Sequence, residues 1–181
     1  KDKYKVKTLD FPQYEKNFFG KLIGECLAGQ YGDFIALDPH IASTLYAADR
    51  FESKKTLEKW LKEGNIVVLD RYVSANQIHQ GGKITDDKAR KKFLEWLDVM
   101  EFTVYGIPRP DLVFYLDVPQ KISEQLISNG KQGLSVNRAV KGKKDLEEIN
   151  KKHLLAARES ALKIVKKGNN WKRISCAPKG E

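Results

Sequence analysis

The chain has 181 residues, 41% of them hydrophobic, and a formal net charge of +9 at pH 7. This length and composition predict one globular domain, residues 1–181, with a sizeable core. No apolar run approaches the roughly 20 residues that a bilayer-spanning helix needs, and no signal-peptide pattern opens the chain, so we expect no membrane partner.

The basic charge is compatible with nucleic acid or with a small anionic substrate. The charge lies mostly on lysines scattered through predicted helices, and no arginine stripe alternates with aromatic residues. We therefore expect a solvated basic surface and no nucleic-acid partner. Cys26 and Cys176 lack metal-ligand spacing, and two isolated thiols favour a reducing, cytoplasmic location.

The first third of the chain alternates a strand with helices. Residues 4–11 alternate in polarity and predict a strand that ends in the loop Phe-Pro-Gln-Tyr. Asn17 is a candidate cap for a helix to about Leu27, and Asp38-Pro39 is a strong helix start. Farther along this second helix, Tyr46 and Arg50 are four residues apart and share a face. Such a pair suits stacking on a planar base and hydrogen bonding to it; the alternative is a core tyrosine and a surface arginine.

A second strand is predicted at 66–69, where four consecutive apolar residues indicate a central parallel strand buried on both faces. Asp70 and Arg71 follow it, at the sheet edge where open α/β sheets bind ligands. A carboxylate there can hold Mg²⁺, and a guanidinium can bind phosphate oxygens. The alternative is a structural Asp-Arg pair that caps the strand-to-helix turn.

The remaining pattern continues to alternate, which predicts a parallel sheet covered on both faces. Residues 128–144 are rich in Gly and Lys without an apolar period, and form either a disordered loop or a functional lid. The other elements expected here are a helix at 85–102, a strand at 112–116, a helix at 122–127, a helix at 145–167 and a strand at 172–175.

Four motifs, in this order and spacing, resemble the thymidylate kinase family, which phosphorylates dTMP. They are Phe-Pro-Gln-Tyr at 11–14, Leu-Tyr-Ala-Ala-Asp-Arg at 45–50, Asp-Arg-Tyr at 70–72 with Gln-Gly at 80–81, and Pro-Asp-Leu at 110–112. The resemblance covers nearly the whole chain. It implies a three-layer α/β sandwich of the P-loop NTPase type with a parallel sheet.

The resemblance also implies roles for individual residues. Tyr46 matches the aromatic that stacks on thymine, and Arg50 the arginine that contacts base and phosphate. Asp70 matches the acid associated with Mg²⁺, and Arg71 the arginine that binds the acceptor phosphate. The remaining matches are Phe11 and Tyr14 at the deoxyribose and 5′-phosphate, Asn76 at the pyrimidine edge, and His79 and Gln80 in the substrate site.

Three positions depart from the family pattern. His79 replaces a Tyr or Phe that packs against the sugar, which bears on deoxyribose selection. Gln13 replaces an arginine that often follows Phe-Pro. Arg138 is the single arginine of the expected lid and the candidate to close over the transferred phosphoryl group.

The phosphate cradle GxxxxGK[ST], which the family places after its first strand, does not occur in the 181 residues. We therefore expect that the first strand and P-loop lie upstream of Lys1, that both ends are cuts in a longer protein, and that this chain alone does not turn over ATP.

The function implied for the parent protein is transfer of the γ-phosphoryl group of ATP to dTMP with Mg²⁺, by a homodimer. The alternatives are a kinase for another nucleoside monophosphate or a deoxynucleoside, and a non-catalytic nucleotide- or nucleic-acid-binding relative.

Overall fold

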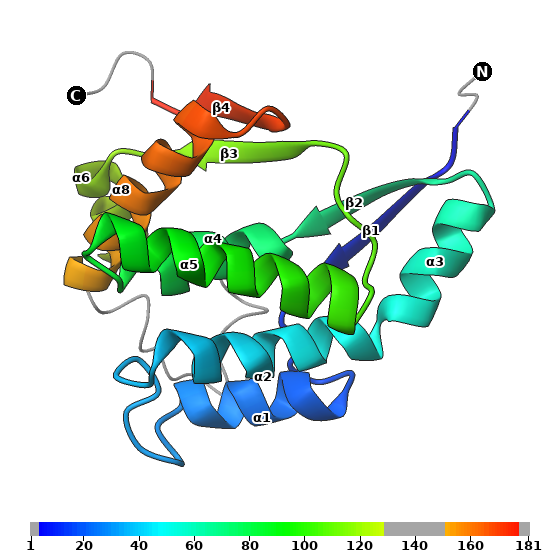
Figure 1. The fold of residues 1–181 in the computed structure, drawn as a ribbon, viewed down its shortest axis with the longest axis horizontal. Coiled ribbons are helices and arrows are strands. Elements are labelled where there is room, and N and C mark those ends of the chain that lie inside the picture. The colour runs from blue at the N-terminus through cyan, green and yellow to red at the C-terminus, as the bar shows by residue number, and fades with distance from the viewer. Residues whose placement is uncertain (1–3, 129–150, 178–181) are drawn as a thin grey trace.

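The computed structural model describes residues 4–128 and 151–177, and alternates short parallel strands with helices (Figure 1). This order confirms the predicted α/β class. The elements are β1 (Val6–Asp10), α1 (Phe18–Leu27), α2 (Pro39–Glu52), α3 (Lys54–Lys62), β2 (Ile66–Asp70), α4 (Val73–Gly82), α5 (Asp87–Asp98), the π-helix η1 (Val99–Val104), β3 (Val113–Asp117), α6 (Gln120–Ser128), α8 (Lys151–Lys167) and β4 (Trp171–Ser175).

Local sequence signals begin the helices where they were predicted. The Asn17 side chain accepts a hydrogen bond from the Gly20 amide at 2.6 Å, and this caps α1. Asp38 accepts from the His40 amide at 2.8 Å, and Pro39 is the first residue of α2. Both predicted helix starts are confirmed.

The four strands form two parallel pairs. β1 pairs with β2 in the register that joins Asp10 to Asp70, and β3 pairs with β4 in the register that joins Asp117 to Ser175. Within residues 4–128 and 151–177, β2 and β3 are not hydrogen-bonded to each other. The strands therefore form two two-stranded sheets in this part of the chain.

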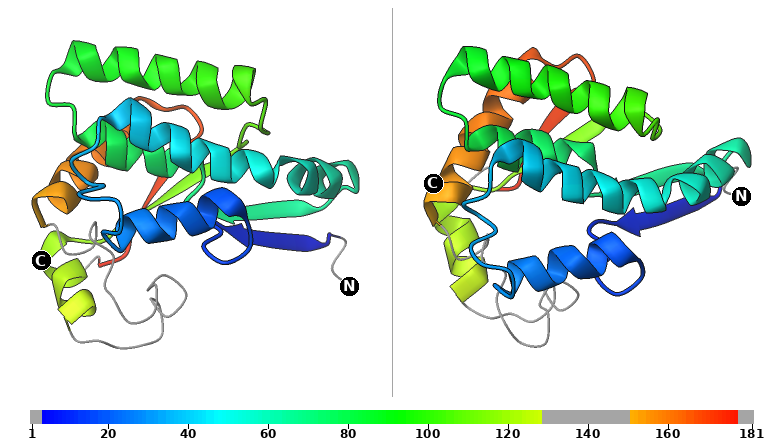
Figure 2. Two further views of the ribbon diagram at one scale, coloured as in Figure 1. Left: turned by 90° about the horizontal axis from the view of Figure 1, so that it is seen from below. Right: turned by 60° about the horizontal axis from the view of Figure 1, so that its bottom comes forward.

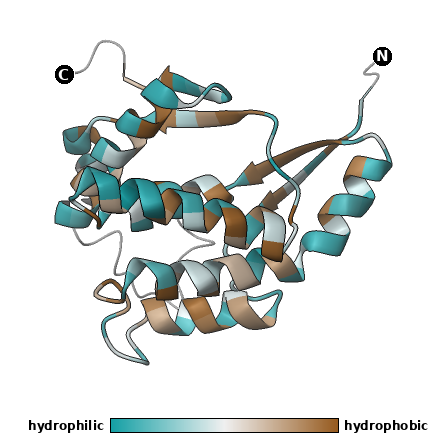
Figure 3. Ribbon diagram, viewed as in Figure 1, coloured by the Kyte–Doolittle hydropathy of each residue, from teal (hydrophilic) through white to brown (hydrophobic). Residues whose placement is uncertain are grey.

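The prediction that β2 is a central strand buried on both faces is wrong for the described residues. Val67 and Leu69 turn inward and pack on the core, whereas Ile66 and Val68 remain 47% and 53% exposed. Since successive side chains of a strand point to opposite faces, one face of β2 lacks cover from any described element. Figure 3 shows that β2 consists mostly of hydrophobic residues.

The helices form layers that carry the core. Helix α2 packs against α1 on one side and against α4 and α5 on the other, and α8 packs against α4 and β4 (Figures 1 and 2). One core cluster joins β1 and β2 to α4 and α5 around Phe93 and Leu97. The other joins α1 to α2 around Ile23. Among the helices that the structure describes, none has the length and apolar character needed to cross a membrane.

The close approach of α1 to the loop after β1 predicts a strong effect of a methyl group at Gly20. A Cβ there would lie 2.2 Å from the carbonyl oxygen of Gln13, which is backbone and cannot swing aside. We expect Gly20→Ala to lower the free energy of unfolding by about 1–3 kcal/mol. Gly81→Ala is the control, because its nearest atom would be 3.6 Å away. Urea unfolding of both variants measures the difference, and equal losses would contradict the prediction.

Candidate functional site

A pocket lies at the carboxyl ends of β1 and β2. Carboxyl ends of parallel strands meet at one sheet edge, where α/β proteins bind ligands. The loops after β1 and β2 and the helices α2 and α4 supply its walls. The lining residues are Phe11, Pro12, Tyr46, Arg50, Arg71, Ala75, Asn76, His79 and Gln80.

Seven of the predicted site residues thus surround one cavity, although they come from distant parts of the chain. Two of them follow strands, Phe11 after β1 and Arg71 after β2. The Phe11 amide donates to the Asp70 carbonyl at 3.1 Å, so the strand pairing continues to the pocket. The other five come from α2 and α4: Tyr46, Arg50, Asn76, His79 and Gln80.

Arg71 has a left-handed backbone, with φ at +57°. Residues other than glycine rarely adopt this region, and such strain is concentrated at functional sites. The turn from β2 into α4 therefore holds Arg71 in a conformation that its own preference does not favour, with its side chain lining the pocket.

Helical spacing explains why Tyr46 and Arg50 lie together, as predicted. Tyr46 is 6% exposed and packs on Phe34, with ring centroids 5.8 Å apart, so it belongs to the core and to the pocket at once. Arg50 is only 1% exposed. The alternative that Arg50 is a surface arginine is therefore wrong.

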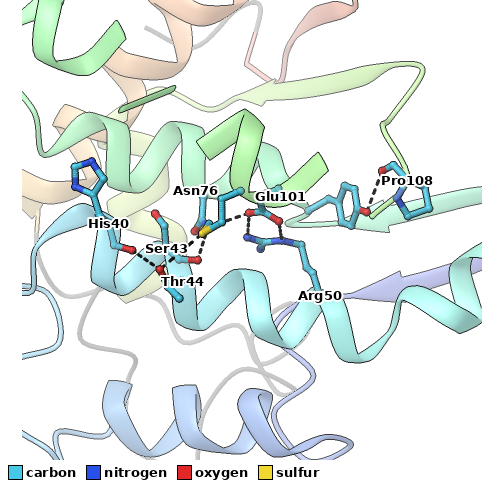
Figure 4. A network of polar contacts seen from close by, with 9 residues as sticks. His40, Ser43, Thr44, Arg50, Asn76, Glu101 and Pro108 are labelled. Atoms are coloured by element: carbon cyan, nitrogen blue, oxygen red, sulfur yellow. Dashed lines mark hydrogen bonds and ion pairs between the residues drawn. The ribbon is translucent and has the colours of Figure 1, made fainter. Parts of the chain in front are cut away.

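Glu101 explains how a guanidinium can be buried. Arg50 Nε donates to Glu101 Oε2 at 3.0 Å, and Arg50 Nη2 donates to Glu101 Oε1 in the same planar pair (Figure 4). Glu101 is fully buried. Asn76 Nδ2 donates to the same Oε1 at 3.3 Å and to the Ser43 carbonyl at 3.2 Å. One carboxylate therefore holds side chains from both helices of the pocket.

A second buried acid secures the loop after β1. Asp49 is fully buried and accepts from Asn17 Nδ2 at 2.7 Å and from the Gln13 amide at 3.2 Å. Burial raises the pKa of Asp49, while the hydrogen bonds from Asn17 and Gln13 oppose that rise. Asp49 thus ties α1 and the Phe11-Pro12 segment to α2.

Two further polar groups are buried in this region, Tyr72 just after β2 and Gln80 in the pocket wall. Burial raises the pKa of Tyr72, which keeps its phenol protonated as it donates to the Pro108 carbonyl at 3.0 Å. Gln80 is 1% exposed, and its Oε1 has no hydrogen-bond partner among the residues that the structure describes. A buried acceptor of this kind in a pocket wall points to a ligand donor or to water.

Three predicted site residues are not brought into the pocket. Tyr14 packs against the cluster between α1 and α2, and Asp70 is exposed at the end of β2. Arg138 and almost all of the expected lid, about 128–144, lie outside the described residues. His79 lines the pocket and stacks on His153 of α8, with ring centroids 5.5 Å apart.

Asp70 and Asp10 occupy neighbouring positions at the ends of β2 and β1. Mg²⁺ in phosphoryl-transfer sites uses one or two carboxylates and completes its shell with waters and phosphate oxygens. No group of three or more His, Cys, Asp or Glu side chains that could hold a metal occurs in the described part of the chain. The paired acids fit a magnesium ion that shares its coordination with substrate, and they do not form a closed protein site.

The sequence reasoning missed Glu101. The predicted helix at 85–102 ends earlier, and residues 99–104 form the π-helix η1, a feature frequent at functional sites. A signal was present, because Glu101 follows Leu97 by four residues and therefore continues the apolar stripe. An acid in such a position indicates a buried partner.

Comparisons with known proteins point to one family. The family model described as thymidylate kinase matches residues 8–179, which is nearly the whole chain. This chain belongs to the thymidylate kinase family. The match includes the pocket and all four motifs that carried the resemblance, so the predicted family is confirmed.

Individual relatives fit the thymidylate kinase family as well. The chain is 30% identical over 118 residues to the thymidylate kinase of Mycobacterium tuberculosis, which covers 65% of this chain and 54% of that protein. It is 35% identical over 156 residues to a "Probable thymidylate kinase" of Thermococcus onnurineus, covering 82% and 65%. The chain thus spans between half and two thirds of the length of these relatives.

A solved thymidylate kinase from Candida albicans has the same fold. Its TM-score is 0.64 at 22% identity, and the alignment covers 94% of this chain and 71% of that one. This likeness bears out the predicted architecture of P-loop thymidylate kinases.

Proposed function

We propose that this chain forms the nucleotide-acceptor site of a thymidylate kinase, which transfers the γ-phosphoryl group of ATP to dTMP and yields dTDP for dTTP synthesis. The observation that carries the proposal is a pocket with aromatic walls and two arginines, Arg50 and Arg71, in a chain of this family. No acid is among the pocket-lining residues, so within the described part of the chain the cavity suits an anionic nucleotide.

The chemistry of the lining supports one orientation of dTMP in the pocket. Tyr46 and Phe11 offer ring surface for thymine and deoxyribose. Arg71 lies beside the sheet edge and can bind the 5′-phosphate through paired N–H donors. Arg50 and Asn76 supply polar groups for the base edge. His79 and Gln80 complete the wall on the sugar side, whereas contact of Tyr14 with the nucleotide stays a prediction.

Phosphoryl transfer needs charge neutralisation and alignment more than covalent chemistry from the protein. A bound Mg²⁺ would neutralise phosphate oxygens, and Asp70, with Asp10 beside it, would hold that ion directly or through water. Arg71 would orient the acceptor phosphate for in-line attack on ATP. Closure of a lid by Arg138 stays a prediction, as do the single-domain organisation, the homodimer and the cytoplasmic location.

Calorimetric titration of the chain with dTMP, thymidine and UMP tests the proposal without requiring turnover. We expect one saturable site per chain, with dTMP bound about 100-fold more tightly than thymidine, because Arg71 contacts the phosphate. A folded chain that binds dTMP no better than thymidine would refute it. Binding of single-stranded DNA with a steep salt dependence, without a dTMP site, would favour the nucleic-acid-binding alternative.

A further inference from the structure

The carboxylate of Glu101 lies behind the pocket and contacts two of its polar side chains. It does not line the cavity itself. Its two oxygens receive Nε and Nη2 of Arg50, and Oε1 also receives Nδ2 of Asn76 at 3.3 Å. Glu101 is fully buried, Arg50 is 1% exposed and Asn76 is 2% exposed, so the three groups are shielded from water.

The contacts of Asn76 determine which end of its amide a ligand meets. Its two partners, the Glu101 carboxylate and the Ser43 carbonyl, can only accept hydrogen bonds. The NH₂ end must therefore face them, which removes the usual ambiguity of an amide side chain. The carbonyl Oδ1, a pure acceptor, is the end left for a ligand.

Glu101 also determines which hydrogen-bond donors of Arg50 remain for a ligand. The pair occupies Nε–H and one N–H of Nη2, which fixes the guanidinium plane and leaves three donors for a ligand: both N–H groups of Nη1 and the second N–H of Nη2. The inner end of the pocket therefore combines guanidinium donors with an amide acceptor, and a carboxylate outside the pocket holds both in place.

We propose that Glu101 is a positioning residue that sets this donor and acceptor order, and thereby selects pyrimidines with a 4-oxo group over those with a 4-amino group. This inference rests on the proposed function. A 4-oxo pyrimidine offers the O4 acceptor to Arg50 and the N3–H donor to Asn76 Oδ1. Cytosine reverses both groups, placing N4–H₂ against donors and N3 against an acceptor, and unpaired polar groups in a buried site are costly.

The test compares the affinities for dTMP and dCMP of the unaltered chain and of Glu101→Gln. A glutamine amide is neutral and offers Arg50 one acceptor oxygen instead of two, so it no longer fixes the guanidinium plane. The Arg50 donors can then turn away from N4–H₂ of cytosine, while the Ser43 carbonyl still holds the NH₂ end of Asn76. We expect the unaltered chain to prefer dTMP by about 100-fold, and the substitution to narrow that preference at least tenfold. If Glu101 had a merely structural role, the substitution would weaken the binding of both nucleotides alike and leave the ratio of their affinities unchanged.

Two further variants keep the test decisive. Glu101→Asp retains a counter-ion for Arg50 but is one methylene shorter, so it cannot keep the planar pair with Nε and Nη2. This variant covers the case in which Glu101→Gln does not fold, and we expect it to narrow the preference for dTMP over dCMP several-fold. Asp117→Asn is the matched control, because Asp117 is a buried carboxylate bound by Arg158 and Arg173 outside the pocket. It should leave the ratio unchanged.

The outcomes separate this inference from the proposed function. If the unaltered chain binds no dTMP, the proposed function is refuted, and the inference about Glu101 is refuted as well because it rests on that function. If the unaltered chain prefers dTMP and a folded Glu101 variant keeps the full preference, the inference is wrong while the proposed function stands.

Discussion

Replacing Arg71 by alanine is expected to weaken dTMP binding about 100-fold and to leave thymidine binding nearly unchanged. Arg71 lines the pocket at the end of β2, where a nucleotide phosphate would meet the sheet edge. A bidentate set of charge-assisted hydrogen bonds contributes on the order of 3 kcal/mol, and each 1.4 kcal/mol changes affinity tenfold. Calorimetry with both ligands measures the effect, and the phosphate-free ligand reports whether the pocket itself is intact.

Controls for Arg71→Ala distinguish a local contact from charge or backbone effects. Arg71→Lys keeps the charge without the planar fork and should recover only part of the affinity. Arg71→Gly relieves the left-handed backbone, so it should be more stable than Arg71→Ala yet bind dTMP as weakly. Arg109→Ala removes a 58% exposed arginine outside the pocket and should leave binding unchanged. Equal losses for dTMP and thymidine would contradict the assignment of Arg71 to the phosphate.

Replacing Arg50 by leucine is expected to lower the free energy of unfolding by about 3–5 kcal/mol. The substitution leaves the Glu101 carboxylate buried without its cation, with Asn76 as its remaining side-chain donor among the described residues. An unpaired buried charge costs far more than the pair contributed, because desolvation of the ion is no longer offset. Chemical unfolding followed by circular dichroism gives the value.

A double-mutant cycle tests this explanation. Arg50→Leu together with Glu101→Leu removes both charges, so the double variant should be much more stable than the sum of the single changes predicts. The pair of Arg109 with Asp98 is the matched control: both of its hydrogen bonds are 2.6 Å long, but its side chains are 58% and 42% exposed. Breaking that pair should cost under about 1 kcal/mol. Similar costs for the two pairs would show that burial is not the cause.

Short-range signals in the sequence placed most of the candidate residues near one another, and seven of them line one pocket. The spacing of Tyr46 and Arg50 put both on one helix face, and both line the pocket. Asp70 and Arg71 were expected at the carboxyl end of a strand because charge follows an apolar run, and β2 ends at Asp70. These predictions succeeded because helix and strand periodicities are local properties of the chain, and because parallel strands direct their carboxyl ends to one edge.

The surroundings of those residues depended on the tertiary structure. Burial of Arg50 requires Glu101, a partner 51 positions away that a π-helical turn brings to α2 and α4. The exposed face of β2 likewise reflects which elements pack beside it, and an apolar run alone carries no information on that. The sequence by itself determined the family, the order of the elements and seven of the nine residues that line the pocket. Only the tertiary structure decided their buried partners, because long-range contacts depend on packing between elements rather than on local periodicity.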